Sequence, residues 1–132
     1  MKKILLNALL IGALAGAVNF GLALLLGESP LETPFIQGTE EFEPTSDFAM
    51  KSLVGTVVLT LIGGLILGLL HRRFGERSIR IWRIVGIAFL FLYGAMPFLS
   101  PGVATAKAGL LINILHFVAG FAALYFLPRA TK

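Results

Sequence analysis

The segment from Gly109 to Leu127 is apolar throughout except for one amide and one imidazole. At a helical rise of about 1.5 Å per residue, it is long enough to cross the hydrocarbon of a membrane. Its polar and small residues recur at steps of four and three and so share one helix face: Gly109, Asn113, His116, Gly120 and Ala123. Polar side chains are costly against lipid, whereas small ones admit a neighbouring helix. We therefore expect the other segments to pack around this face.

Composition extends the membrane interpretation to the whole chain. Of its 132 residues, 57% are hydrophobic and only 14% are charged. A soluble domain of this size has too little interior to bury so much apolar surface. The net charge of +4 does not indicate nucleic acid, because the basic residues lie at the ends of apolar runs. The chain has no cysteine, which excludes disulfides and thiolate chemistry.

Three further apolar runs complete a set of four predicted transmembrane helices, at about residues 4–26, 50–70, 81–99 and 109–127. The first run follows Lys2 and Lys3, as in a signal peptide, but it continues well past its small residues, which favours a retained span. The predicted fold is all-α: an integral membrane, antiparallel four-helix bundle forming a single domain over residues 1–132.

The first two spans each carry a stripe of small and polar residues, which is typical of close helix packing in membranes. In the first span the stripe is Ala8, Gly12, Gly16, Asn19 and Ala23. In the second span it is Ser52, Thr56, Thr60, Gly64 and Gly68, whose hydroxyls can bond their own backbone.

The predicted loop at residues 27–49 holds six of the seven acidic residues and three of the six prolines. Prolines at this density disfavour a long helix, so we expect an irregular loop. Its interspersed apolar residues suggest that it lies back on the helix ends. A solvated loop is the plain interpretation, and a lid or a partner-docking surface is the alternative.

Basic residues predict the orientation. Placing both termini and the turn near residue 75 on one side gives that side nine of the eleven lysines and arginines. The other side keeps Lys51 and Lys107. By the positive-inside tendency, the protein lies in the cell membrane with both termini cytoplasmic and the acidic loop outside. The arginines of the turn could also hold anionic lipid headgroups: Arg72, Arg73, Arg77, Arg80 and Arg83.

Counting along each helix from its outer end predicts a polar layer in the outer half of the bundle. Asn19, Thr56, Tyr93 and Asn113 fall roughly 9 to 11 Å deep, and Thr60 and His116 roughly 14 to 15 Å. In one interpretation these side chains bond one another and fix the helix register. In the other they line a pocket for a small or lipid-like ligand.

Catalytic, metal and cofactor sites are not predicted. No carboxylate lies within a span, and a bis-histidine haem site would need a second histidine beside His116.

The second half of the chain resembles an uncharacterised family of small bacterial four-helix membrane proteins, known only as a domain of unknown function. The resemblance spans about residues 70–129. It rests on Arg80-Ile81-Trp82-Arg83, on Pro97, on His116 and on Leu127-Pro128-Arg129. The sequence departs from the family pattern at Leu115, where methionine is usual, and in its longer acidic loop. The resemblance implies a four-span fold and no particular activity.

Three functional hypotheses follow. The first is a non-enzymatic protein that binds a small or lipid-like ligand in the polar layer. The second is an accessory subunit that docks on a larger membrane complex. The third is a small membrane enzyme in which His116 and Tyr93 exchange protons with a substrate.

Overall fold

The computed structural model describes residues 1–28, 31–99 and 105–131. These residues form four α-helices and one short 3₁₀ helix, so the all-α prediction is confirmed for them. The elements are α1 (Lys2–Leu26), α2 (Thr45–Phe74), α3 (Arg77–Leu99), α4 (Ala106–Phe126) and η1 (Leu127–Thr131). Most of the connection between α3 and α4, residues 100–104, lies outside the described residues.

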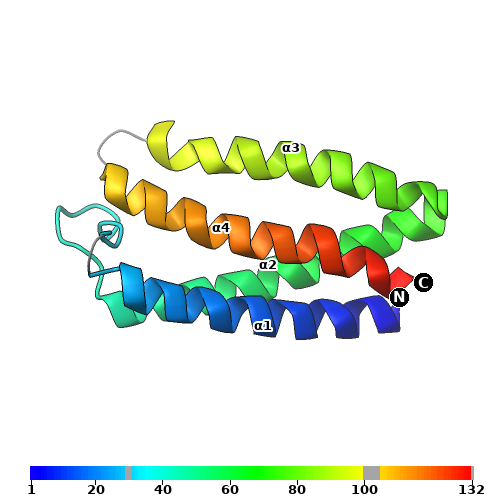
Figure 1. The fold of residues 1–132 in the computed structure, drawn as a ribbon, viewed down its shortest axis with the longest axis horizontal. Helices are drawn as coiled ribbons and strands as arrows, with labels where there is room; N and C mark the ends of the chain where they lie inside the picture. Colours follow the sequence, from blue (N-terminus) through cyan, green and yellow to red (C-terminus); the bar gives the residue numbers. More distant parts are fainter. Residues whose placement is uncertain (29–30, 100–104, 132) are drawn as a thin grey trace.

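The helices lie lengthwise beside one another (Figure 1). Both termini and the turn between α2 and α3 lie at one end of the molecule, called here the basic end. The loop between α1 and α2 lies at the opposite end, called here the acidic end. Helices α2 and α3 meet at their turn and diverge toward the acidic end, where α3 lies beside α4 (Figure 1).

Glycines hold α1 against α2 at very short range. A methyl group added to Gly16 would lie 3.0 Å from the Leu53 carbonyl oxygen, and one added to Gly64 would lie 2.5 Å from Cβ of Ala8. All five residues of the predicted stripe on α1 are buried. On α2 the stripe is buried from Thr56 onward, while Ser52 is half-buried. The two stripes therefore form one seam between these helices.

A different seam joins α3 to α4. Leu90 of α3 lies over Gly120, where an added methyl group would come within 2.5 Å of it, and Leu124 of α4 fills the matching space at Gly86. At the basic end, Trp82 lies against Gly63 of α2. Ser78 is the one buried residue of α3 among those described, so this helix is peripheral.

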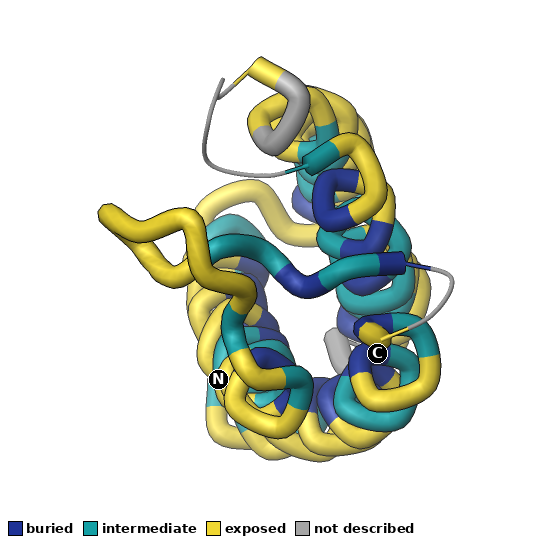
Figure 2. The backbone as a smooth tube through the Cα atoms, turned by 90° about the vertical axis from the view of Figure 1, so that its left-hand side faces the viewer, coloured by how far each residue is buried: buried dark blue, intermediate teal, exposed yellow. Residues whose placement is uncertain are grey.

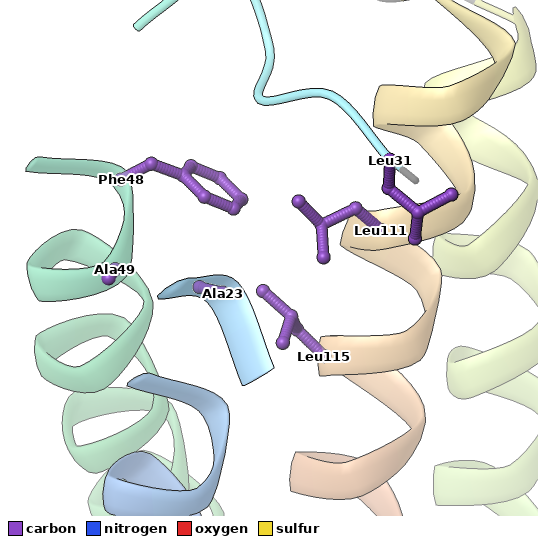
Figure 3. Packing of buried hydrophobic residues seen from close by; sticks show 6 residues of the cluster. All are labelled: Ala23, Leu31, Phe48, Ala49, Leu111 and Leu115. Carbon is purple, nitrogen blue, oxygen red and sulfur yellow. The ribbon is translucent and has the colours of Figure 1, made fainter. Parts of the chain in front are cut away.

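The place of α4 differs from the sequence expectation. Its polar stripe turns toward α3, and of that stripe only Gly109 is buried. The buried leucines of α4, Leu111 and Leu115, lie on another face and pack with Ala23, Ala49 and Phe48 (Figure 3). The polar face is therefore not the centre around which the chain packs. Close glycine contacts make the α1–α2 pair that centre instead, and α4 meets it through leucines.

The acidic-end loop is ordered by its own contacts. Phe35 and Phe42 face each other across an isolated antiparallel bridge, with ring centroids 4.7 Å apart. Gly38 turns the chain between them with a φ of +85°, which suits glycine. Leu31 is buried in the cluster with Leu111 (Figure 3), so the loop lies back on the helix ends as expected. Helix α2 begins at Thr45, five residues before the predicted span.

Candidate functional site

Asn19 is the polar residue that joins three helices. Its side chain is 1% exposed. Its Nδ2 donates one hydrogen bond to Oγ1 of Thr56 on α2, at 2.9 Å, and one to the carbonyl oxygen of Leu115 on α4, at 3.0 Å. Because a carbonyl can only accept, the Leu115 bond fixes which end of the amide carries the hydrogens. Oδ1 of Asn19 is buried and has no hydrogen-bond partner among the described residues.

Three hydroxyl side chains follow one another along α2 at intervals of four residues, and the middle one, Thr56, is the partner of Asn19. Each donates to the backbone carbonyl four residues earlier: Ser52 to Phe48 at 2.9 Å, Thr56 to Ser52 at 2.7 Å, and Thr60 to Thr56 at 2.7 Å. This back-bonding satisfies a hydroxyl inside an apolar environment without a partner from another helix. The hydroxyl hydrogens are therefore already in use.

A groove of about 270 Å³ runs between α2 and α4, with Asn19 of α1 in its wall. Its remaining lining residues come from the end of the loop and from the two helices: Glu43, Phe48, Lys51, Ser52, Gly55, Thr56, Leu59, Ile112, Leu115, His116 and Ala119. At the acidic end, Lys51 and Glu43 form an ion pair. Apolar side chains dominate the rest of the wall.

His116 borders the groove and is half-buried. Its Nδ1 lies 2.8 Å from the carbonyl oxygen of Ile112. Since that oxygen is an acceptor, Nδ1 carries the hydrogen, and in the neutral ring Nε2 is left as an acceptor. Among the described residues, no hydrogen bond involves Nε2. The ring also lies against Tyr93 of α3, with centroids 5.1 Å apart.

Tyr93 and Asn113 lie on the α3 side of α4, away from the groove. Tyr93 is 44% exposed and stacks on Phe89, with centroids 5.3 Å apart. Oδ1 of Asn113 is buried beside Gly94 and, like that of Asn19, has no hydrogen-bond partner within the described residues. This side of α4 thus holds a second, smaller set of polar groups.

The six residues predicted for the polar layer therefore separate into groups. Asn19, Thr56 and His116 line the groove, Thr60 lies below it in the α1–α2 seam, and Tyr93 and Asn113 face the α3 side. Sequence reasoning placed Ser52 on the stripe of α2 but not in the site, and it did not name Gly55, although Gly55 follows Ser52 by three residues and so lies near the same face. It also missed the Glu43–Lys51 pair, which depends on the early start of α2.

The loop is tied to α4 by a second set of charges. Glu32 accepts hydrogen bonds from Oγ1 of Thr105, at 2.9 Å, and from Nζ of Lys107, at 3.2 Å. These two hydrogen bonds, in that order, hold the pKa of Glu32 below its ordinary value of 4.5. Thr105 also caps α4 by accepting from the backbone N–H of Ala108.

The basic end carries the five arginines of the predicted lipid-headgroup site, and all five are exposed. None forms an ion pair with any residue in the described part of the chain. Beside them, His71 and Ser78 join α2 to α3 through a contact of 3.2 Å. Within the same described residues, no group of three histidine or carboxylate side chains is arranged to hold a metal ion.

Four helices that are long and apolar enough to cross a membrane indicate a multi-pass membrane protein. Many large apolar side chains are exposed. Along the helices the backbone alternates between buried and exposed stretches (Figure 2). The chain belongs to a family of unknown function, DUF6069, whose family model matches residues 3–132. No curated protein and no solved structure matches it.

Proposed function

We propose that the protein is a non-enzymatic membrane protein whose groove between α2 and α4 binds a lipid-like ligand from the bilayer. The observation that carries this proposal is a mainly apolar groove with a few polar side chains, Asn19, Ser52, Thr56 and His116, called here the groove floor; this is the usual character of small-molecule sites. Its volume, about 270 Å³, lies just below the range of roughly 300–1,000 Å³ that is typical of drug-sized ligands. The groove therefore suits one hydrocarbon chain or a small headgroup.

The proposed setting is an antiparallel bundle in the cell membrane, with both termini in the cytoplasm. Lys2, Lys3 and the five arginines of the turn lie at the basic end, whereas the loop at the other end is acidic. The positive-inside tendency then puts the acidic loop outside. In this orientation the groove lies in the outer half of the bilayer, close to the headgroups.

The polar side chains of the floor favour a ligand-binding role over a role in fixing the helix register alone. Thr56 and Leu115 already take both amide hydrogens of Asn19, and these two bonds suffice to set the helix register. They leave Oδ1 of Asn19 buried without a partner, and beside it the half-buried His116 keeps an unpartnered Nε2 at the groove. Buried polar groups without partners are uncommon in folded proteins unless they serve a ligand or ordered water.

Filling the groove tests the proposal. A methyl group added to Gly55 would meet no atom within 4 Å, so a side chain can begin here without strain, and Gly55→Leu places a large one at the groove. Gly21 on α1 has the same open surroundings but does not line the groove, so Gly21→Leu is the matched control. Native mass spectrometry from mild detergent should show a small bound mass on the wild type and Gly21→Leu but not on Gly55→Leu. Equal masses on all three would contradict the proposal.

An accessory subunit is the second candidate, and the exposure of α3 favours it. Phe91, Leu92 and Leu99 are 66–71% exposed on a helix that is otherwise almost unburied. Such a face suits either lipid or a neighbouring membrane helix. The same mass spectra separate the two, because a co-purifying polypeptide that is lost on Leu92→Asn would support the subunit.

A further inference from the structure

The groove floor has no hydrogen to give. Both amide hydrogens of Asn19 are donated, to Thr56 and to Leu115. The hydroxyl hydrogens of Ser52 and Thr56 go to backbone carbonyls, and the Nδ1 hydrogen of His116 goes to Ile112. Every polar side chain of the floor is therefore committed as a donor.

Acceptors remain. Oδ1 of Asn19 has no partner within the described residues but is itself buried, so the acceptor within reach of a ligand is Nε2 of His116, which offers a lone pair beside the groove when the ring carries its hydrogen on Nδ1. The hydroxyl oxygen of Ser52 also keeps acceptor capacity. A ligand group that brings only acceptors, such as a carboxylate, a phosphate or an ether, would find no free hydrogen among these four side chains and would lose its own hydration beside them.

The charges at the acidic end of the groove also disfavour anions. Lys51 is the cation that lines the groove; Glu43 neutralises its charge, and the hydrogens that its ammonium keeps lie at the exposed end of the side chain, away from Asn19 and His116 in sequence and on the first turns of α2. The other cation on this side, Lys107, pairs with Glu32. Six of the seven acidic residues lie in or beside this loop, so an anionic headgroup would meet more negative than positive charge.

We propose that the ligand of this groove is a neutral, single-chain molecule whose polar group is a hydroxyl that donates to Nε2 of His116. This inference rests on the proposed function and narrows it to long-chain alcohols as a chemical class. A neutral hydroxyl can donate a hydrogen bond to the acceptor at the groove floor. Its transfer into hydrocarbon also costs far less free energy than that of a protonated amine, the other common donor group. The hydrocarbon chain of the ligand then lies against the apolar side chains that line the groove.

Four probes that share a twelve-carbon chain test this inference: 1-dodecanol, which donates and accepts; dodecyl methyl ether, which only accepts; dodecane; and dodecanoate, which is an anion. Each competes with deuterated 1-dodecanol for the purified wild-type protein, and native mass spectrometry measures the displacement. We expect 1-dodecanol to bind about tenfold more tightly than the ether, as one hydrogen bond to an unpartnered acceptor allows. Dodecanoate should bind most weakly.

His116→Phe keeps a ring against Tyr93 but removes Nε2, so it should abolish the preference for the alcohol while dodecane still binds. If the alcohol and the ether bind the wild type equally, the hydroxyl inference is wrong and the groove proposal stands. If no probe binds, or if Gly55→Leu binds all of them as the wild type does, the groove proposal itself fails. The wild-type comparison decides between these outcomes even if His116→Phe does not fold.

Discussion

Asn19 and Thr56 form a side-chain hydrogen bond of 2.9 Å that joins α1 to α2 inside the bundle, 37 residues apart in the chain. The same amide also holds α4 through the Leu115 carbonyl oxygen. One side chain therefore fixes the register of three helices along the bundle, and its removal should weaken the packing of all three.

We expect Asn19→Leu to lower the free energy of unfolding by about 1–2 kcal/mol, because two interhelical hydrogen bonds are lost inside the membrane. A cycle with Thr56→Val should give a coupling energy of about 0.6 kcal/mol, the average for such pairs. Unfolding in mixed micelles measures both values. Asn7→Leu is the control, since the side chain of Asn7 donates to the Lys3 carbonyl oxygen of its own helix and its loss should change stability little. A coupling near zero would contradict the role given to this pair.

The α1–α2 seam should not tolerate added methyl groups. Gly64→Ala would drive a new Cβ to 2.5 Å from Ala8, and Gly16→Ala would bring one to 3.0 Å from a backbone oxygen that cannot move aside. Each should cost about 1–3 kcal/mol of stability through overpacking. Gly21→Ala, with nothing within 4 Å, should cost none. Thermal unfolding of the three variants in one detergent ranks them, and equal stabilities would contradict the seam.

The Glu32 contacts should make the anchoring of the loop depend on pH. Because the folded state lowers the pKa of Glu32, its contribution to stability is present above pH 4.5 and is lost as the pH falls through the lower folded-state pKa. At pH 7 the variant Glu32→Gln should therefore melt below the wild type, and the difference should shrink below pH 4.5 and vanish at lower pH. Glu40→Gln, on an exposed residue of the same loop, is the matched control. A difference that stays constant with pH would exclude this origin.

Membrane orientation can be checked directly, because the chain has no cysteine of its own. Glu40→Cys and Glu76→Cys replace exposed glutamates at the acidic and basic ends. In intact cells a membrane-impermeant maleimide should label position 40, and it should reach position 76 only after the cells are permeabilised. The reverse pattern would invert the proposed topology.

Much of the fold could be predicted from sequence, because apolar run length and small-residue spacing are local properties. The stripe from Ala8 to Ala23 is buried as its spacing indicated. The role of α4 could not be predicted in this way. Its polar face and its leucine face are both plausible inward faces, and only the approach of α1 and α2 decides that Leu111 and Leu115 face them.

The candidate site was predicted only in part for a related reason. Depth along a helix places Asn19, Tyr93 and Asn113 in one layer, but it does not say which way each side chain points. Rotation about the helix axis separates Tyr93 and Asn113 from the groove. The contact between Asn19 and Thr56 could be predicted, because each residue lies on the small-residue stripe of its helix and such stripes pack against each other.

Leu31 and Phe48 pack with Leu111 and Leu115 at the acidic end of the bundle (Figure 3), and the groove lies along the side of the bundle between α2 and α4. The proposed ligand therefore arrives sideways, by diffusion in the plane of the bilayer. Its occupancy then depends on its mole fraction among the lipids and not on its solubility in the surrounding medium.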